Sequence, residues 1–164
     1  MSTVWRTWVA FAAIGAGLIH VASTVGAPLW AALLLGMLGL AEFVWGAITF
    51  SREAPPWPRI AVAFAIAPAL LWIVGLVTRT VPPSLSPLSL GVATLFTLFV
   101  ATVLGVHLRR PAEAPLPSVT RYVIALAAGA AVVIALTLPA LAATVVGGGG
   151  PSGLTTFEEH GHTR

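Results

Sequence analysis

Long apolar runs, separated by short polar segments rich in proline, dominate the pattern of this chain. A helix needs about 20 largely apolar residues to cross the hydrocarbon core of a bilayer, and each run reaches that length. The runs cover about residues 4–24, 28–50, 59–80, 88–108 and 119–146. The pattern therefore predicts an all-α membrane protein, a bundle of five transmembrane helices that occupies residues 1–146.

Proline and glycine mark the connections between these runs. Gly26 and Pro28 predict a tight turn that makes a helical hairpin of the first two runs. Polar, proline-rich loops are expected after the second, third and fourth runs, at 51–58, 81–87 and 109–118. Most of the chain is thus assigned to spanning helices, and little remains for a soluble domain.

The end of the chain departs from this regular pattern. At 1.5 Å per residue the last run is about 42 Å long, which exceeds a hydrocarbon core of about 30 Å. We therefore expect this helix to tilt, to kink at Pro139 or to project from the membrane. Four glycines at 147–150 predict a flexible hinge, and 151–164 predicts a polar tail.

Composition agrees with a protein surrounded by lipid. The 164 residues are 58% hydrophobic and only 8% charged, with a mean hydropathy of +0.99, whereas an average soluble domain is about 25% charged. We expect a multi-pass protein of the cell membrane. The absence of cysteine excludes disulfides, thiolate metal sites, iron–sulfur clusters and a cysteine nucleophile. Aspartate is also absent, which excludes a Ser-His-Asp triad but not one completed by glutamate.

The eight cationic residues are all arginine, and they lie near the ends of the runs. One side of the predicted bundle holds Arg6, Arg52, Arg59, Arg109, Arg110 and Arg121, and the other holds Arg79 and Arg164. Because cytoplasmic loops carry the excess of positive charge, this distribution predicts a cytoplasmic N-terminus and an outside C-terminus. Dispersed arginines indicate topology, and we expect no nucleic-acid partner.

Six tryptophans add information on depth. Trp5, Trp8 and Trp57 are expected near the inner interface, Trp30 near the outer one, and Trp45 and Trp72 deeper. Tryptophan is enriched at membrane–water interfaces, so the first four fit an interfacial belt. The two deeper residues are expected to pack inside the bundle or to face acyl chains.

Two ionisable residues, His20 and Glu42, lie inside the first two apolar runs. Their helix faces carry small neighbours, Ala13, Gly17 and Thr24 beside His20, and Gly39 and Gly46 beside Glu42. Small residues let two helices approach closely, so we expect these faces to pack against other helices.

Depth arithmetic separates the two ionisable residues. Counted from the turn at 1.5 Å per residue, His20 lies about 8 Å deep and Glu42 about 24 Å deep. A direct pair is therefore not expected. We expect Glu42 to form an ion pair with Arg6, which has a similar depth, and His20 to lie near the depth of Arg79.

Two interpretations of His20 and Glu42 stay open from sequence. Ionisable groups within a membrane are functional candidates, so they could serve a proton or cation path, or contact a quinone or haem in a partner subunit. The other interpretation makes each a hydrogen-bonded packing residue.

The polar tail carries the other cluster of chemical interest. His160 and His162, beside Glu158 and Glu159, form a pattern that can chelate Cu(II) or Zn(II). Phe157 could instead anchor the tail on a neighbouring subunit, with the acids facing a basic surface. A third interpretation is a polar end that only aids solubility. The chain predicts no cofactor of its own apart from this possible metal site.

Two short segments carry a resemblance to known proteins. They are GLIH at 17–20 and LW at 71–72 followed by TRTVP at 78–82. With them, about residues 10–108 resemble small actinobacterial polytopic membrane proteins of unassigned function, which carry a histidine in the first helix and a Trp…Arg-Thr…Pro segment. This chain lacks the acidic residue expected in the later helices of that group. Because the group has no established activity, the resemblance implies a fold and no catalytic residue.

Motifs for phosphate binding or zinc-dependent hydrolysis are absent from the sequence. We therefore expect a non-catalytic accessory subunit of a larger membrane complex, a respiratory or other redox assembly, with other integral membrane subunits and lipid as its partners. The alternative is a small transporter or copper-handling protein that uses the tail to collect metal and the helix residues to pass something inward.

Overall fold

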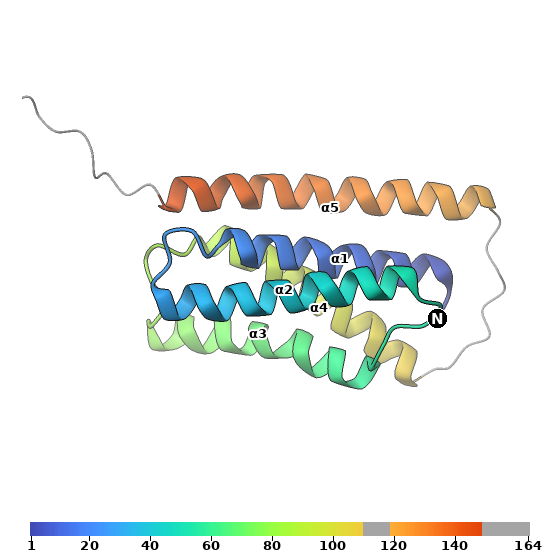
Figure 1. Ribbon diagram of the computed structural model, residues 1–164, viewed down its shortest axis with the longest axis horizontal. Helices are drawn as coiled ribbons and strands as arrows, with labels where there is room; N and C mark the ends of the chain where they lie inside the picture. The colour runs from blue at the N-terminus through green and yellow to red at the C-terminus, as the bar shows by residue number, and fades with distance from the viewer. Residues whose placement is uncertain (110–118, 149–164) are drawn as a thin grey trace, which may run out of the picture.

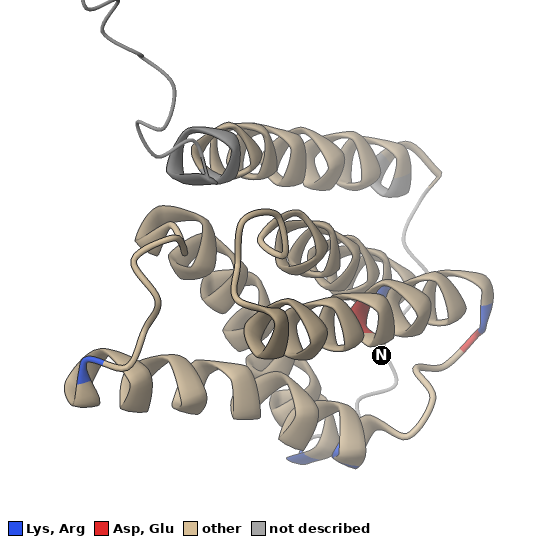
Figure 2. Cartoon of the chain, turned by 60° about the vertical axis from the view of Figure 1, so that its left-hand side comes forward, with Lys and Arg blue, Asp and Glu red and all other residues tan. Residues whose placement is uncertain are grey.

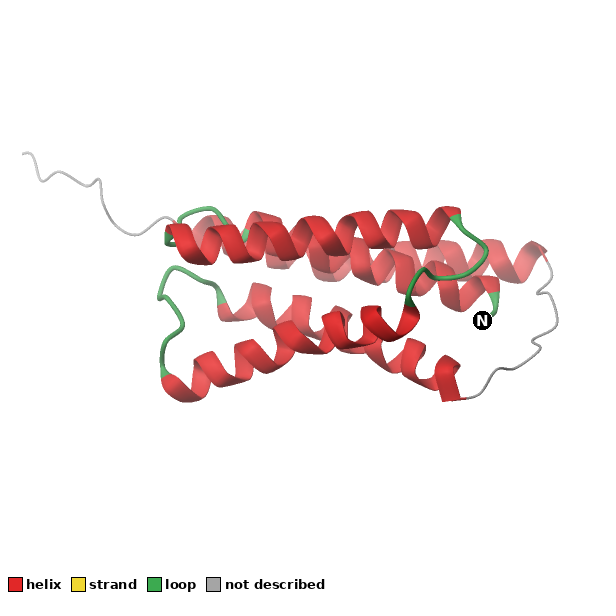
Figure 3. Cartoon of the chain, turned by 60° about the horizontal axis from the view of Figure 1, so that its bottom comes forward, coloured by secondary structure: helices red, strands yellow, loops and turns green. Residues whose placement is uncertain are grey.

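The computed structural model describes residues 1–109 and 119–148, without the side chains of 121–122 and 144–148. Its regular secondary structure consists of α-helices, which lie along the long axis of the bundle, with α3 and α4 crossing each other at an angle (Figures 1 and 3). The helices are α1 (Thr3–Ala22), α2 (Leu29–Ser51), α3 (Pro58–Thr78), α4 (Pro87–Arg109) and α5 (Val119–Gly148). Each begins and ends within two residues of its predicted run, and each is long and apolar enough to cross a membrane.

Local chemistry sets several of these boundaries. The side chain of Ser2 caps α1 by accepting a hydrogen bond from the backbone of Trp5. Pro58 and Pro87 open α3 and α4, where a missing N–H costs nothing and the fixed φ suits a helix. Helix α5 continues through Pro139 to Gly148, so Gly147 and Gly148 are helical and not part of a hinge. The polar tail lies outside the described residues.

Helix α1 is the centre of the bundle. It packs against α2, α4 and α5, and α4 also contacts α3 and α5. Helices α2 and α3 follow each other in the sequence, yet no close backbone contact joins them. Instead α3 returns to the bundle through α4, as Figure 1 shows. The boundary between α2 and α3, which has no close backbone contact, is here named the α2–α3 seam.

The core is built from small and branched apolar residues, and the largest apolar side chains point outward. Helices α1 and α4 are about half buried, whereas α2, α3 and α5 are mostly exposed. Buried residues of α1 and α4 include Val9, Ala16, Ile19, Phe96 and Leu104. A bundle that exposes so many large apolar side chains has the surface expected of helices whose solvent is lipid.

Glycines bring α1 and α2 into direct backbone contact. A Cβ added to Gly17 would lie 2.6 Å from the carbonyl oxygen of Gly39, and one added to Gly39 would lie 2.6 Å from that of Gly17. Likewise, a Cβ on Gly46 would lie 2.9 Å from the carbonyl oxygen of Ala10. The predicted small-residue faces therefore do pack together.

Two side-chain hydrogen bonds attach α5 to the rest of the bundle. Trp8 Nε1 donates to the carbonyl oxygen of Ala125 at 3.0 Å, and Ser89 Oγ donates to that of Ala140 at 2.6 Å. The first joins α5 to α1 and the second joins it to α4. Trp8 is thus a packing residue of the bundle as well as a member of the predicted interfacial belt.

Charged residues gather mainly at the helix ends and connections (Figure 2). Four described arginines lie at or near the end of the bundle that holds the N-terminus, here named the arginine end: Arg6, Arg52, Arg59 and Arg109. Arg79 follows the last residue of α3 at the opposite end. Within the body of α2, Glu42 is the acidic residue that departs from this distribution.

Candidate functional site

His20 and Glu42 form a buried hydrogen-bonded pair between α1 and α2. The imidazole Nδ1 lies 2.7 Å from the carboxyl Oε2, and the two residues are 3% and 7% exposed. The expectation that depth separates them is wrong. Glu42 pairs with His20 and not with Arg6, whose buried Nε has no hydrogen-bond partner. Arg79 is exposed and follows the last residue of α3, and the next residue, Thr80, lines a cavity together with His20.

The register of the two helices explains the first part of this correction. Gly39 lies opposite Gly17 and Val21, which puts His20 level with a residue about four positions before Glu42. The offset along the axis is about 6 Å and not about 16 Å. The error came from starting both helices at one level. In the structure, residues 23–28 form a series of turns that continues past the end of α1, and α2 begins well beyond that end (Figure 1).

Side-chain direction closes the remaining distance. The Cα–Cβ bonds of a helix tilt toward its own N-terminus. Because α1 and α2 are antiparallel, His20 leans toward the arginine end and Glu42 leans away from it. The two side chains therefore lean toward each other along the axis, and the close glycine contact brings them together across it.

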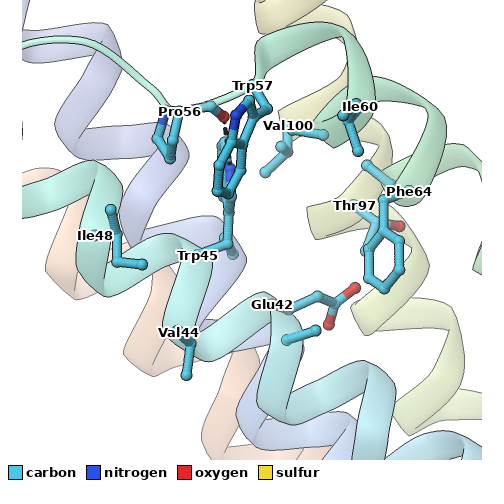
Figure 4. Close-up of a pocket in the computed structure, with 14 residues that line it drawn as sticks. Glu42, Val44, Trp45, Ile48, Pro56, Trp57, Ile60, Phe64, Thr97 and Val100 are labelled. Carbon is cyan, nitrogen blue, oxygen red and sulfur yellow. Dashed lines mark hydrogen bonds between the residues drawn. The ribbon is translucent and has the colours of Figure 1, made fainter.

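Glu42 lines a cavity of about 270 Å³, here named the Glu42 pocket. Figure 4 shows the carboxyl group pointing toward Phe64 and Thr97, with the indoles of Trp45 and Trp57 farther along the same wall. The remaining lining is apolar and comes from α1, α2, α3, α4 and the connection before α3. Trp57, at the rim, is 72% exposed and precedes α3 at the arginine end of the bundle.

The other carboxyl oxygen, Oε1 of Glu42, is buried and has no hydrogen-bond partner among the described residues. It remains an acceptor whichever group holds the proton of the His20–Glu42 bond. If Nδ1–H donates, Glu42 is a carboxylate; if Oε2–H donates, Oε1 is the carbonyl oxygen of the acid. A buried acceptor without a partner is costly. The pocket therefore favours a molecule that brings a donor or a positive charge.

The tryptophans of this pocket are held in place by the connection between α2 and α3. Trp45 Nε1 donates to the carbonyl oxygen of Pro56 at 3.0 Å. The next residue, Trp57, adopts a left-handed backbone with φ 44° and ψ 57°. That conformation costs a bulky residue about 1–2 kcal/mol. The local strain coincides with the pocket wall, a pattern found at functional sites.

His20 lines a second cavity of about 530 Å³, here named the His20 pocket, toward the opposite end of the bundle. Its walls include Trp30, Pro68, Trp72 and Thr80. The bond to Glu42 uses Nδ1, so the other ring nitrogen of His20, Nε2, takes no part in it. His20 and the Trp…Arg-Thr…Pro segment lie far apart in the sequence but line the same cavity. Arg79 itself does not line it.

The two pockets lie one after the other along the α2–α3 seam. Phe64 lines both, and the neighbouring residues Thr94 and Thr97 line one each. The His20–Glu42 pair lies between the cavities, with one member facing each. Among the residues that line either cavity, His20 and Glu42 are the titratable ones.

The described residues contain no candidate metal-binding centre. In the part of the chain that the structure covers, no group of three or more His, Asp or Glu side chains could hold a metal ion. The predicted tail ligands Glu158, Glu159, His160 and His162 lie outside the described residues, as does Phe157.

Comparison with known proteins adds no assignment: no family model, no curated protein and no solved structure matches this chain. The geometry alone must indicate the chemistry. A buried imidazole–carboxyl pair, with Glu42 lining one pocket and His20 lining the other, can bind a positively charged or donating group and can exchange a proton.

Several site residues were not recognised from sequence. Trp57 and Trp30 were assigned to interfacial belts, and Trp45 and Trp72 to packing or lipid contact, but each lines one of the two pockets. Their convergence depends on which helices are neighbours, which spacing within one helix does not show. The His20–Glu42 contact did have a usable signal, because aligning Gly17 with Gly39 fixes the hairpin register.

Proposed function

We propose that this protein is a small transporter of the cell membrane, with the His20–Glu42 pair as its central binding group. The observation that carries the proposal is the position of the buried pair between two pockets that extend toward opposite ends of the bundle. Ionisable groups inside a membrane are costly and commonly mark substrate or proton pathways. The paired geometry gives this chain a polar centre, which the sequence-based preference for an accessory subunit did not anticipate.

The proposed orientation follows from charge. The arginine end faces the cytoplasm, because positive residues are retained on that side. The Glu42 pocket would then be reached from the inside and the His20 pocket from the outside. Each pocket is then reached from one aqueous compartment, so a reagent added on one side of the membrane should reach only one of the two pockets.

Cysteine accessibility tests the proposal directly, because the native chain contains no cysteine. Three alanines on α3 provide a matched set: Ala61 lines the Glu42 pocket, Ala67 lines the His20 pocket, and Ala63 is exposed but lines neither. Each is replaced singly by cysteine in oriented proteoliposomes. A membrane-impermeant thiol reagent is then added from one side at a time.

The transporter proposal expects A61C to react from the arginine-end side and A67C from the opposite side. A63C, facing lipid, should stay unreactive because thiols need water to ionise. Unreactive A61C and A67C, or reaction of both from one side only, would contradict a path through the bundle.

An accessory subunit is the second candidate, and the α2–α3 seam favours it. Consecutive helices that leave a seam can receive a helix of another protein, and Leu71 on the His20 pocket is 71% exposed. Extraction in a mild detergent tests this idea. Co-purification of large redox subunits in fixed stoichiometry would support it, and a stable chain without partners would count against it.

Metal capture by the tail stays a prediction, since those residues lie outside the described part. If His160 and His162 bind Cu(II) or Zn(II), the purified protein should carry metal that the H160A/H162A variant lacks. Elemental analysis after dialysis measures this. Equal metal content in both proteins would refute metal binding by the tail.

A further inference from the structure

We infer that the Glu42 pocket binds a lipophilic organic cation, and that binding of this cation releases one proton from the His20–Glu42 pair. The inference rests on the proposed transporter function and names its substrate class. Three features of the site support it: the unpartnered oxygen of Glu42, the aromatic and apolar walls of the pocket, and the charge balance of the His20–Glu42 pair.

The ligand's polar group follows from Oε1 of Glu42. This oxygen is an acceptor in both proton arrangements of the 2.7 Å bond to His20, and it is buried without a partner. A ligand that offers only acceptors, such as a quinone, does not satisfy it. An ammonium group does, either by donating a hydrogen bond or by placing its positive charge beside the oxygen.

The rest of the ligand follows from the walls. Apart from Glu42, the lining is apolar or aromatic, with Thr97 as its hydroxyl-bearing member. Thr97 already uses its hydroxyl to donate to the backbone oxygen of Thr94 at 3.0 Å. Few further polar contacts are therefore offered, and the body of the ligand must be apolar. A cavity of about 270 Å³ restricts it to a small molecule.

The tryptophans distinguish a cation from a neutral donor. Aromatic faces attract ammonium groups, and tryptophan does so most strongly. Trp45 is oriented by its hydrogen bond to Pro56, and Trp57 is held at the rim by its left-handed backbone. Figure 4 shows both indoles on the pocket wall that also carries Glu42. A carboxylate with two indoles is the recognition chemistry of an organic cation.

The proton release follows from charge. A protonated pair carries no net charge, so a cation added beside it would leave one uncompensated positive charge in a buried site. Loss of the proton makes the pair negative, and the cation then restores neutrality. The proton leaves from Nε2 of His20, which lines the other pocket, and passes to water. The Nδ1–H bond to Glu42 is retained.

Among the side chains that the structure describes, no other titratable group lines either pocket. On α2 and on α5, the described side chains within the helix bodies include no titratable group besides Glu42. The remaining described groups on helices packed around the pair lie near helix ends: Arg6, Arg59, Arg79, His107 and Arg109. The proton released on cation binding is therefore assigned to the His20–Glu42 pair itself.

Calorimetric titration of the full-length protein in lipid nanodiscs tests the inference. The probe is benzyltrimethylammonium, whose charge does not change with pH, and its neutral counterpart is neopentylbenzene, in which carbon replaces nitrogen. Repeating each titration in buffers of different ionisation enthalpy counts the protons released. We expect the cation alone to bind, with about one proton released for each cation bound, and its affinity to fall as the pH is lowered because protons compete with the cation.

Two variants and one control give the test its specificity. Glu42→Gln should weaken cation binding by about 10- to 100-fold and abolish the proton release. Glu53→Gln, an exposed glutamate in the connection after α2, should change neither. If Glu42→Gln does not fold, Trp57→Leu provides the second test. At this exposed rim it should weaken the cation about two- to fivefold and leave the fold intact.

The outcomes separate this inference from the proposed function. Equal binding of the cation and its neutral counterpart would overturn the cation site while leaving a transporter of neutral molecules. Cation binding without proton release at any pH would overturn the linkage. If neither probe binds, the cation inference fails. If A61C and A67C are also inaccessible to the thiol reagent, the transporter proposal fails as well.

Discussion

Replacing Gly39 by alanine is the sharpest test of how the His20–Glu42 pair is positioned. The added Cβ would lie 2.6 Å from the carbonyl oxygen of Gly17, and 2.9 Å from both the backbone nitrogen and Cγ2 of Val21. Backbone atoms cannot rotate away, so α1 and α2 must separate. Moving that contact from 2.6 Å to an ordinary 3.4 Å requires a displacement of about 0.8 Å.

This displacement has a calculable cost. It is enough to take the 2.7 Å bond between His20 and Glu42 beyond the usual range of about 2.7–3.2 Å. Overpacking costs about 1–3 kcal/mol and a lost interhelical hydrogen bond about 0.6–1.7 kcal/mol. The higher helix propensity of alanine offsets about 1 kcal/mol of this loss in stability. We therefore expect Gly39→Ala to destabilise the fold by about 2 kcal/mol.

Gly36, one turn earlier on α2, supplies the matched control. A Cβ there would meet only Thr24 Cγ2 at 3.6 Å, an ordinary contact. Gly36→Ala should therefore be neutral or stabilising by up to about 1 kcal/mol. Unfolding in mixed detergent micelles, followed by tryptophan fluorescence, measures both variants. If Gly39→Ala is as stable as Gly36→Ala, the glycine contact does not set the helix spacing and the reasoning is wrong.

Three further predictions test other contacts. His20→Ala and Glu42→Ala in a double-mutant cycle should show a coupling of about 1–3 kcal/mol in the same assay, and additive effects would argue against a direct bond. Trp45→Phe should lose about 1 kcal/mol with its hydrogen bond to Pro56; unchanged stability would show that the bond contributes nothing. Arg79→Gly should stabilise by about 1 kcal/mol, because Arg79 ends α3 at φ 54°. A less stable Arg79→Gly would mean that its side chain, and not backbone strain, dominates.

The site was less predictable than the helices, and Glu42 shows why. Its stripe of small neighbours correctly indicated a packed helix face. Its partner depended on the register between α1 and α2, and the turn at 23–28 does not reveal that register by length alone. Gly17 and Gly39 could have supplied it, because their backbones touch. The convergence of Trp45 with Trp57 had no comparable signal, since it follows from the fold of the connection around Pro56.

The sequence by itself determined that the described chain is helical, where its helices begin and end, and which faces carry small residues. The physical reason is local: apolar run length, proline at helix starts and residue size all act within one helix. Only the tertiary structure decided that Glu42 pairs with His20, that α2 and α3 leave a seam, and that four tryptophans line two pockets. Those properties depend on the offset and order of helices in three dimensions, which antiparallel packing and side-chain direction fix together.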